Sequence, residues 1–312
     1  MKILKLQGLA LIILSSILYS QQTTFDFLRM DISPRAAALS GAFVSNTDDP
    51  NVIFYNPAGL RQLTGTPISF SFAKHLMDIN LASISASTEI GSIGRFGFGV
   101  QYINYGSFER ADENGYKDGT TFGANEIALT AGYAGTIDDN FYYGINARFI
   151  GSFIDSYSST ALAADLGVQY LIPSERISIG VSALNMGGQL SSYVDKNEDL
   201  PLDVRVGISK RMEHLPLILF WSFNKLNEKT DNFGGRFKNF VLGGEFSLSR
   251  VLKLRLGFDN EKRKDLKVGT TAGLAGFNLG LGALINKYNF DYSYSSLGSI
   301  GALHRVGIST TF

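Results

Sequence analysis

The sequence predicts an all-β protein, a transmembrane antiparallel β-barrel of about fourteen strands. Three observations lead to this prediction. Apolar and polar residues alternate with a period of two along most of the chain, short and long connections alternate between the expected strands, and only 18% of the 312 residues are charged. A typical soluble domain has about 25% charged residues. A barrel wall needs the alternation because one face meets lipid and the other meets a polar lumen.

The first twenty residues have the layout of a secretory signal peptide. Lys2 and Lys5 precede an apolar run from Leu9 to Leu18, and Ser20 offers a small residue for cleavage. The run is shorter than the roughly 20 apolar residues that a membrane-spanning helix needs, which makes a membrane anchor the weaker alternative. We therefore expect residues 1–20 to be removed on export.

Residues 21–66 lack clean alternation and form a second expected unit. They contain an alanine-rich stretch from Arg35 to Ala42 and several Pro and Gly residues, which interrupt regular structure. Such a segment suits a plug or hatch inside the lumen or against its periplasmic mouth. Fourteen strands leave space for a plug, whereas eight would be filled by side chains alone. A loose periplasmic extension is the alternative.

Residues 67–312 are the predicted barrel. In 251–259, alternate residues from Leu252 to Phe258 are apolar, and Lys253, Arg255, Gly257 and Asp259 lie between them. The charged residues of that second face are expected to face the lumen. Pairing with one another is the default expectation there, and a polar path through the lumen is the alternative. A soluble β-sandwich also alternates, so no single strand decides. The strands are expected at 67–74, 79–89, 94–106, 124–135, 140–152, 160–172, 176–185, 202–211, 215–224, 238–248, 251–259, 272–285, 289–297 and 303–312.

The connections between these strands favour a membrane barrel. Short connections such as 90–93 alternate with longer ones, chiefly 107–123, 186–201 and 225–237. Outer-membrane barrels have short periplasmic turns and longer extracellular loops. The three long loops are therefore the segments expected to contact partner proteins. The last strand ends in Phe312, which resembles the recognition signal of the barrel-assembly machinery; an ordinary final strand that happens to end in Phe is the alternative.

Several segments resemble a known family of outer-membrane proteins. Asn56-Pro57-Ala58-Gly59-Leu60 resembles a motif of the FadL-like barrels. The stretches 25–28 and 33–41 resemble the opening of the PorV/PorQ family within that superfamily, and 99–108, 155–159, 200–202 and 291–305 resemble its PorQ branch. The resemblance gives the plug a set of structural motif residues: Arg35, Gly41, Asn56, Pro57, Ala58, Gly59 and Leu60.

The resemblance also implies a function. PorQ-like proteins belong to the type IX secretion system, in a surface attachment complex with PorU, PorV and PorZ that processes secreted cargo and attaches it to lipopolysaccharide. In that scheme PorU performs the chemistry and the barrel anchors a PorZ-like protein. The alternative is a FadL-type transporter of hydrophobic small molecules, which shares the motif at Asn56–Leu60. The short chain leaves little length for the large apolar loops with which such transporters capture ligand.

The residues themselves predict no catalysis, cofactor or metal site. The chain has no cysteine, which excludes thiol catalysis and thiolate metal sites. Its three histidines, His75, His214 and His304, cannot all meet, because His75 and His214 fall at opposite ends of the predicted barrel. Asp48-Asp49 is a weak cation-binding candidate beside the alternative of two solvated acids. Hydrolase and phosphate-binding motifs are absent from the sequence.

The expected location is the outer membrane of a Gram-negative bacterium, with the barrel surrounded by outer-membrane lipid. The 28 basic and 28 acidic residues balance, so the chain has no net charge that would attract nucleic acid. Lipopolysaccharide is a further candidate partner, although basic residues such as Arg61 and Lys74 are scattered rather than clustered.

Overall fold

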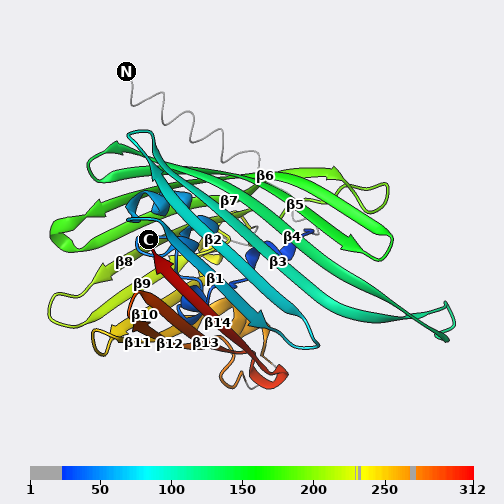
Figure 1. The fold of residues 1–312 in the computed structure, drawn as a ribbon. Helices are drawn as coiled ribbons and strands as arrows, with labels where there is room; N and C mark the ends of the chain where they lie inside the picture. Colours follow the sequence, from blue (N-terminus) through cyan, green and yellow to red (C-terminus); the bar gives the residue numbers. More distant parts are fainter. Residues whose placement is uncertain (1–22, 229, 231–232, 268–271) are drawn as a thin grey trace.

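Fourteen strands close into one antiparallel barrel in the computed structural model, which describes residues 23–228, 230, 233–267 and 272–312. The predicted fold class and strand number are confirmed. β1 and β14 close the barrel and lie side by side in Figure 1, in register from Pro67↔Thr311 to Lys74↔His304. Closure leaves no open edge at the level of the bilayer, where backbone groups have no water to bond. The predicted signal peptide lies outside the described residues.

The strands follow one another around the barrel in sequence order. Their bounds are β1 Pro67–Lys74, β2 Asn80–Ile90, β3 Gly94–Ala111, β4 Lys117–Asp138, β5 Phe141–Ile154, β6 Tyr157–Ile172, β7 Ile177–Ser191, β8 Asp203–Arg211, β9 Leu217–Phe223, β10 Phe240–Ser247, β11 Leu252–Asp259, β12 Phe277–Ile285, β13 Tyr288–Ser296 and β14 Ala302–Thr311.

The helices are short. No helix among the described residues is long and apolar enough to cross a bilayer. The N-terminal segment contains η1 (Asp26–Arg29), α2 (Pro34–Ala38), η2 (Pro50–Phe54) and η3 (Pro57–Gln62), and the connections contain η4 (Pro173–Glu175), η5 (Phe233–Lys238), α3 (Asn260–Asp265) and η6 (Gly298–Ile300).

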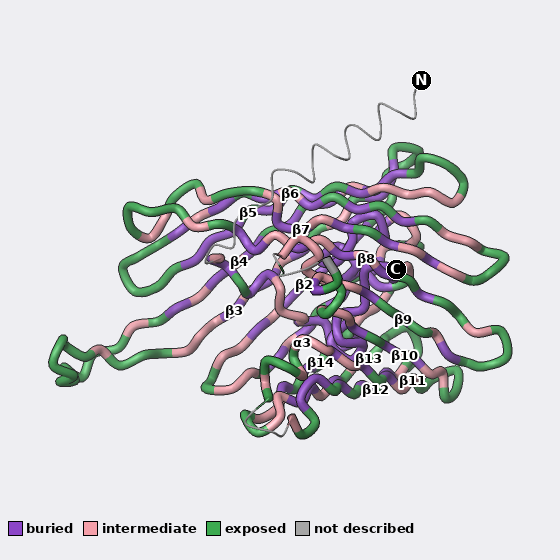
Figure 2. The backbone as a smooth tube through the Cα atoms, turned by 180° about the vertical axis from the view of Figure 1, so that it is seen from behind, coloured by how far each residue is buried: buried purple, intermediate pink, exposed green. Residues whose placement is uncertain are grey.

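The wall is apolar outside and polar inside, as the alternation predicts. On β11, the side chains of Leu252 and Leu256 are about half exposed, whereas those of Arg255 and Asp259 are buried. A soluble protein has the opposite arrangement, with apolar residues inside and charges outside. Lipid covers the exposed leucines in a membrane, so this inverted pattern fits a transmembrane barrel. Figure 2 shows the buried residues gathered along the middle of the strands.

Three predicted boundaries are wrong. The expected loop 107–123 is mostly a hairpin, because β3 and β4 stay paired through Phe108↔Phe122 and Glu109↔Thr121. β7 continues to Ser191, into the expected loop 186–201, and β12 begins only at Phe277. Polar composition suggested loops in the first two cases. Pairing to a neighbouring strand, which a single segment does not reveal, decided them.

The two ends of the barrel differ. At one end, here called the short-turn mouth, neighbouring strands are joined by the connections 91–93, 139–140, 173–176, 212–216, 248–251 and 286–287. The opposite end, here called the long-loop end, includes the connections 192–202, 224–239 and 260–276. The general asymmetry of outer-membrane barrels places the short-turn mouth on the periplasmic side.

Residues 23–66 lie inside the barrel and are here called the plug. Helix α2 contacts β11 to β14, η2 contacts β1 to β3, and η3 contacts β3 to β6. The plug starts at the long-loop end, where Thr24 N donates to Asp199 O at 3.0 Å, and finishes at the short-turn mouth, where Thr66 N donates to Phe312 O at 2.8 Å. It therefore runs through the lumen from one end to the other.

Candidate functional site

The strongest contact between plug and wall is made by Arg35 in helix α2. Pro34 occupies the first turn of this helix and Ser33 caps it, accepting a hydrogen bond from Ala36 N. This start presents Arg35 to the wall. Its Nε donates to Glu245 Oε2 at 2.8 Å and its Nη2 donates to Glu245 Oε1 at 3.1 Å. Two parallel hydrogen bonds to one carboxylate fix both position and orientation.

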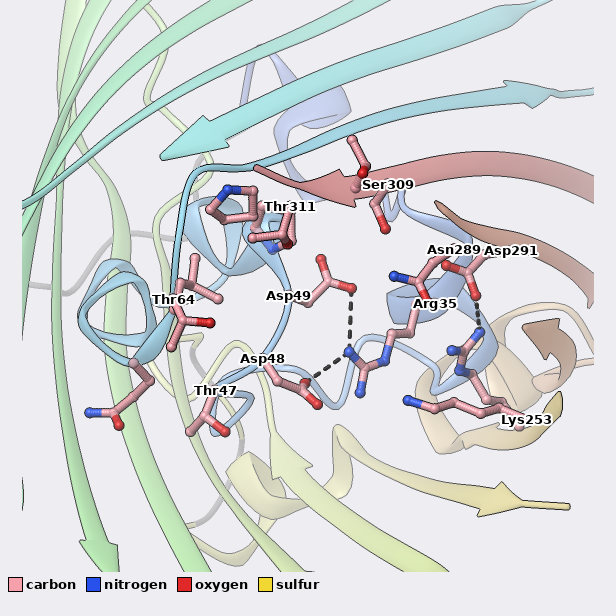
Figure 3. A pocket seen from close by; sticks show the side chains of 16 residues that line it. Arg35, Thr47, Asp48, Asp49, Thr64, Lys253, Asn289, Asp291, Ser309 and Thr311 are labelled. Carbon is pink, nitrogen blue, oxygen red and sulfur yellow. Dashed lines mark hydrogen bonds and ion pairs between the residues drawn. The ribbon is translucent and has the colours of Figure 1, made fainter. Parts of the chain in front are cut away.

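Glu245 lies at the centre of a chain of charges along the inner wall. Arg255 Nε donates to its Oε2 at 2.7 Å, and Lys253 Nζ lies 3.5 Å from its Oε1. Arg255 also donates to Asp291 Oδ1 at 2.5 Å. The lumen charges Lys253 and Arg255 are thus paired, as the sequence predicted. Figure 3 shows Lys253 and Asp291 near the plug arginine.

Asp48 and Asp49 of the plug face Arg35 from its other side. Arg35 Nη1 lies 2.8 Å from Asp48 Oδ1 and 3.5 Å from Asp49 Oδ2. Burial opposes ionisation of Asp48, but the charge and hydrogen bond of Arg35 outweigh it and lower its pKa. Burial raises the pKa of Asp49, even though Arg35 and the hydrogen bonds from Asn51 act in the opposite direction. The two neighbouring acids therefore differ in their tendency to ionise.

A cavity of about 430 Å³ opens beside this cluster at the short-turn mouth. Its lining includes Arg35, Asp48, Asp49, Lys253 and Asp291, which Figure 3 labels. Cations and carboxylates alternate around it, so it is a charged and nearly balanced space. Such a lining suits water and ions rather than an apolar ligand, since an apolar ligand would leave these charges desolvated.

The motif Asn56–Leu60 fixes the other half of the plug. Asn56 caps η3, where its Oδ1 accepts from Ala58 N at 3.1 Å. Its Nδ2 donates to Val44 O of the plug at 2.8 Å and to Val168 O of β6 at 3.1 Å. A buried amide that satisfies three backbone groups at once holds two plug segments and one wall strand together.

Glycines of the wall make room for this motif. A Cβ built on Gly144 would lie 2.3 Å from the carbonyl carbon of Pro57, and one built on Gly167 would lie 2.0 Å from Asn56 Oδ1. Both distances are shorter than any real contact, so these two positions need glycine. Gly280 makes room in the same way for helix α2, since a Cβ there would lie 2.4 Å from the Cβ of Ala38.

The remaining motif residues serve the shape of the plug. Gly41 follows helix α2 with φ +75 and donates its N–H to Ala36 O at 2.9 Å, which is the left-handed conformation common at helix ends. Gly59 packs against Val52, and Leu60 is fully buried. All seven motif residues thus lie in the plug, where they form its helix ends and its contacts with the wall.

A second buried ion pair escaped the sequence analysis. Arg148 Nη2 donates to Asp165 Oδ2 at 2.8 Å, and Arg148 Nη1 donates to Asn185 Oδ1 at 2.7 Å. Asn146 links the pair to the plug, because its Nδ2 donates to Asp165 Oδ2 and to Ile53 O, both at 2.8 Å. Asn146 and Arg148 alternate with apolar residues on β5. That spacing is the one signal that marked them as lumen residues.

The other predicted sites are placed as follows. Phe312 lies at the short-turn mouth with its side chain exposed, and Lys287 Nζ is 4.6 Å from the centre of its ring. His304 on β14 shares a hydrogen bond of 2.7 Å between its Nδ1 and the Tyr292 hydroxyl. Within the described ranges, no group of three or more His, Asp or Glu side chains is arranged to hold a metal ion. The role of Phe312 in assembly stays a prediction.

Comparisons with known proteins give a fold but no sequence family. No family model matches the chain, and no curated protein matches it at a significant level. Among solved structures, the toluene transporter TbuX of Ralstonia pickettii is similar with a TM-score of 0.56 and 13% identity, covering 90% of this chain and 98% of that one. A FadL homologue of Pseudomonas aeruginosa has a TM-score of 0.56 and 11% identity, covering 90% and 98%.

The toluene transporter TodX of Pseudomonas putida is a third similar structure, with a TM-score of 0.54 and 11% identity, covering 87% of this chain and 95% of that one. This chain folds as a FadL-like outer-membrane β-barrel. At such low identity, the similarity of this chain to these three proteins concerns the fold alone. The narrower resemblance to the PorV/PorQ family is not confirmed by these comparisons and stays a prediction.

Proposed function

We propose that this chain is a plugged outer-membrane barrel that anchors a protein assembly at the cell surface and performs no chemistry itself. The observation that supports this proposal is that the plug is fixed to the barrel wall. Arg35 and Glu245 are both buried, and their ion pair ties the plug to the wall. A barrel filled in this way offers its rim and loops for contact with other proteins.

The packing of the plug elsewhere supports the same interpretation. Arg305 Nε on β14 donates to Asp31 O at 2.6 Å, and Tyr55 OH donates to Asp31 Oδ1 at 2.8 Å. The cavity lined by Asp31, Tyr55, Gln101 and Arg205 has a volume of only about 10 Å³. This cavity is too small to hold a small molecule.

The finer form of the proposal comes from the sequence resemblance. A PorV/PorQ-like barrel would belong to the type IX secretion system and would hold the attachment complex of PorU, PorV and PorZ at the membrane. The barrel would supply the anchor and PorU the cargo-processing chemistry. The polar, filled lumen is compatible with that division of labour, because anchoring needs no path through the barrel.

A FadL-type transporter of hydrophobic small molecules is the second candidate. The comparisons favour it over the first, because TbuX and TodX are toluene transporters and the structure from Pseudomonas aeruginosa is a FadL homologue. It requires an apolar path. In this chain the plug anchors at Arg35 and Asn56 would have to shift, or the wall would have to open, before such a path exists.

Gentle solubilisation of the native outer membrane, followed by isolation of this protein and mass spectrometry, tests the anchor function. Stoichiometric recovery of a large surface protein or a sortase-like protease supports the anchor. Recovery of the barrel alone, with a bound fatty acid or another apolar ligand, contradicts the anchor and supports the transporter.

Uptake by intact cells gives the complementary test, because their lipopolysaccharide leaflet slows the passive entry of hydrophobic molecules. Cells lacking the chain are compared with cells that express it, using a radiolabelled long-chain fatty acid. The anchor function predicts equal uptake. Uptake that depends on the chain would contradict it as the sole function.

A further inference from the structure

The hairpin of β3 and β4 extends past the strands on either side of it. β2 pairs with β3 only as far as Asn80↔Asn104, and β5 pairs with β4 only from Ala124↔Ile154. Residues 105–123, here called the hairpin ribbon, therefore extend beyond the ladders with β2 and β5 at the long-loop end, and Figure 1 shows them reaching beyond the neighbouring loops. At about 3.3 Å per residue, the eight steps from Asn104 to Asp112 span about 26 Å.

The two edges of the hairpin ribbon differ in what they offer. On the β4 edge, Asp155 N donates to Gly123 O at 3.1 Å, and Asp118 Oδ1 accepts from Thr120 N at 2.8 Å. On the β3 edge, the part of the chain that the structure describes places no strand beside 107–111. Unpaired backbone groups along a strand edge are a template for another strand.

The hairpin ribbon has internal contacts that keep this edge extended. Phe108 and Phe122 stack across the two strands with their ring centres 5.4 Å apart. Lys117 and Glu109 form an ion pair near the tip, and Asp112 Oδ1 accepts hydrogen bonds from two backbone N–H groups in the turn. A two-stranded hairpin is marginally stable alone in water, so a third strand would complete it as a sheet.

The charge of the hairpin ribbon selects the partner. Residues 107–123 contain four acids and two bases, giving a net charge of −2. Both bases are engaged, since Lys117 pairs with Glu109 and Arg110 pairs with Asp155. The edge residues 107–111 carry one acid and one base, and the remaining acids Asp112, Glu113 and Asp118 lie at and near the tip. Two copies of this acidic ribbon laid side by side would bring these like charges together, which argues against pairing with a second copy of the chain. A strand with basic side chains is complementary.

We propose that the β3 edge of the hairpin ribbon, residues 107–111, receives a basic edge strand of a surface protein, which adds to the sheet as a third strand. This recognition mode draws affinity from backbone hydrogen bonds and specificity from alternate side chains. The inference rests on the anchor function proposed above and names the contact through which the anchored protein is held. The exposed Phe108 and the acidic Glu109 then lie on opposite faces of the extended sheet, each against alternate partner residues.

Photo-crosslinking in the native membrane tests the contact. A photoreactive amino acid replaces Ser107, Phe108, Glu109, Arg110 or Ala111, one at a time, and Asn286 at the short-turn mouth as the control. We expect all five to react with one segment of one protein, with the crosslinked position moving along that segment as the probe moves along β3. The segment should be an edge strand containing Lys or Arg. Crosslinks scattered over unrelated segments would overturn the proposal.

Two variants separate this inference from the anchor function. The first replaces 107–123 by two glycines, which removes the hairpin ribbon but keeps the register Asn104↔Asn125. The second is Glu113→Lys, which changes the net charge of the ribbon from −2 to 0. Its matched control is Asp265→Lys, at an exposed position in the connection 260–276 at the same end of the barrel. Barrel assembly is checked by the shift in electrophoretic mobility on heating.

The expected result is loss of the partner from the shortened barrel and at least a tenfold weaker retention by Glu113→Lys at low salt, with Asp265→Lys unchanged. Full retention by the shortened barrel would overturn the inference while the anchor function stands. If the unmodified barrel retains no surface protein, the anchor function itself fails. Equal weakening by Glu113→Lys and Asp265→Lys would mean that general charge, rather than this edge, attracts the partner.

Discussion

Arg35 and Glu245 are 210 residues apart in the sequence, yet the Arg35 Nε and Glu245 Oε2 atoms lie 2.8 Å apart inside the barrel. The side chains are 7% and 1% exposed. This ion pair joins the plug to β10 with both side chains almost entirely buried. Removing one charge of a buried pair typically costs about 3–5 kcal/mol, and here the loss is softened because Arg35 keeps Asp48 and Asp49 and Glu245 keeps Arg255.

The first prediction concerns Glu245→Gln. This change leaves Arg35 and Arg255 facing each other without the carboxylate that separates them, so the plug should detach more readily. We expect a higher ion conductance in planar lipid bilayers and faster protease cleavage within the plug. The barrel itself should still assemble. Among the described residues, Glu245 contributes to the wall through its ion pairs and through the backbone pairing of β10, and the substitution leaves that backbone pairing in place.

The matched control is Glu213→Gln, the same chemical change at an exposed position in the connection between β8 and β9. It should leave both conductance and cleavage unchanged. If Glu245→Gln conducts no more than Glu213→Gln, the ion pair does not hold the plug in place.

The wall of this barrel could be predicted from the sequence because its signal is local. The alternation of Leu252 and Leu254 with Lys253 and Arg255 assigns each residue to a face without any knowledge of the neighbouring strands. The alternation does not identify the residue with which a lumen charge pairs. Arg35 was recognised through a motif, but Glu245 was not, since alternation gives the face of a residue and not the level at which the plug meets it.

The hairpin ribbon shows the second limit of the sequence. Residues 107–123 are rich in polar and turn-forming residues, so they resemble a loop when considered alone. The contact that makes them strands is the stacking of Phe108 on Phe122 across the hairpin. Such a pair becomes visible only when the register of the two strands is known.

The second prediction is that Asn56→Ala loosens the η3 half of the plug. The change removes the hydrogen bonds to Val44 O, Val168 O and Ala58 N. Each buried backbone group left without a partner costs about 1–3 kcal/mol. We expect earlier thermal unfolding in detergent micelles and new protease cleavage near η3. Asn197→Ala, at an exposed position, is the control, and an equal effect there would contradict the role assigned to Asn56.

The third prediction compares two wall glycines. In Gly144→Ala, the new methyl group would lie 2.3 Å from the Pro57 carbonyl carbon, so either the plug or β5 must move. In Gly188→Ala, the methyl group meets no atom within 4 Å. We expect misassembly or exposure of the plug only in Gly144→Ala, measured by mobility on heating and by proteolysis. Normal behaviour of Gly144→Ala would show that η3 does not pack against β5 as described.

The fourth prediction is a pair of opposite pH dependences at the short-turn mouth. Burial raises the pKa of Asp49, so the folded state binds this proton more tightly than the unfolded chain. Stability from this group is therefore gained as the pH falls through the raised pKa, and the gain is complete below the ordinary value near 3.9. Asp49→Asn removes this gain. The free energy of unfolding of the wild type, relative to that of Asp49→Asn, should rise as the pH is lowered from about 7 toward 4.

Asp48 should behave in the opposite way. Burial opposes its ionisation, but Arg35 at 2.8 Å lowers its pKa below the ordinary value. The stability that ionised Asp48 contributes is fully present above about pH 4 and is lost as the pH falls through the lowered pKa. Unfolding in urea across this pH range, measured for the wild type, Asp48→Asn and Asp49→Asn, gives the two slopes directly. Slopes of the same sign would mean that Arg35 does not distinguish the two acids.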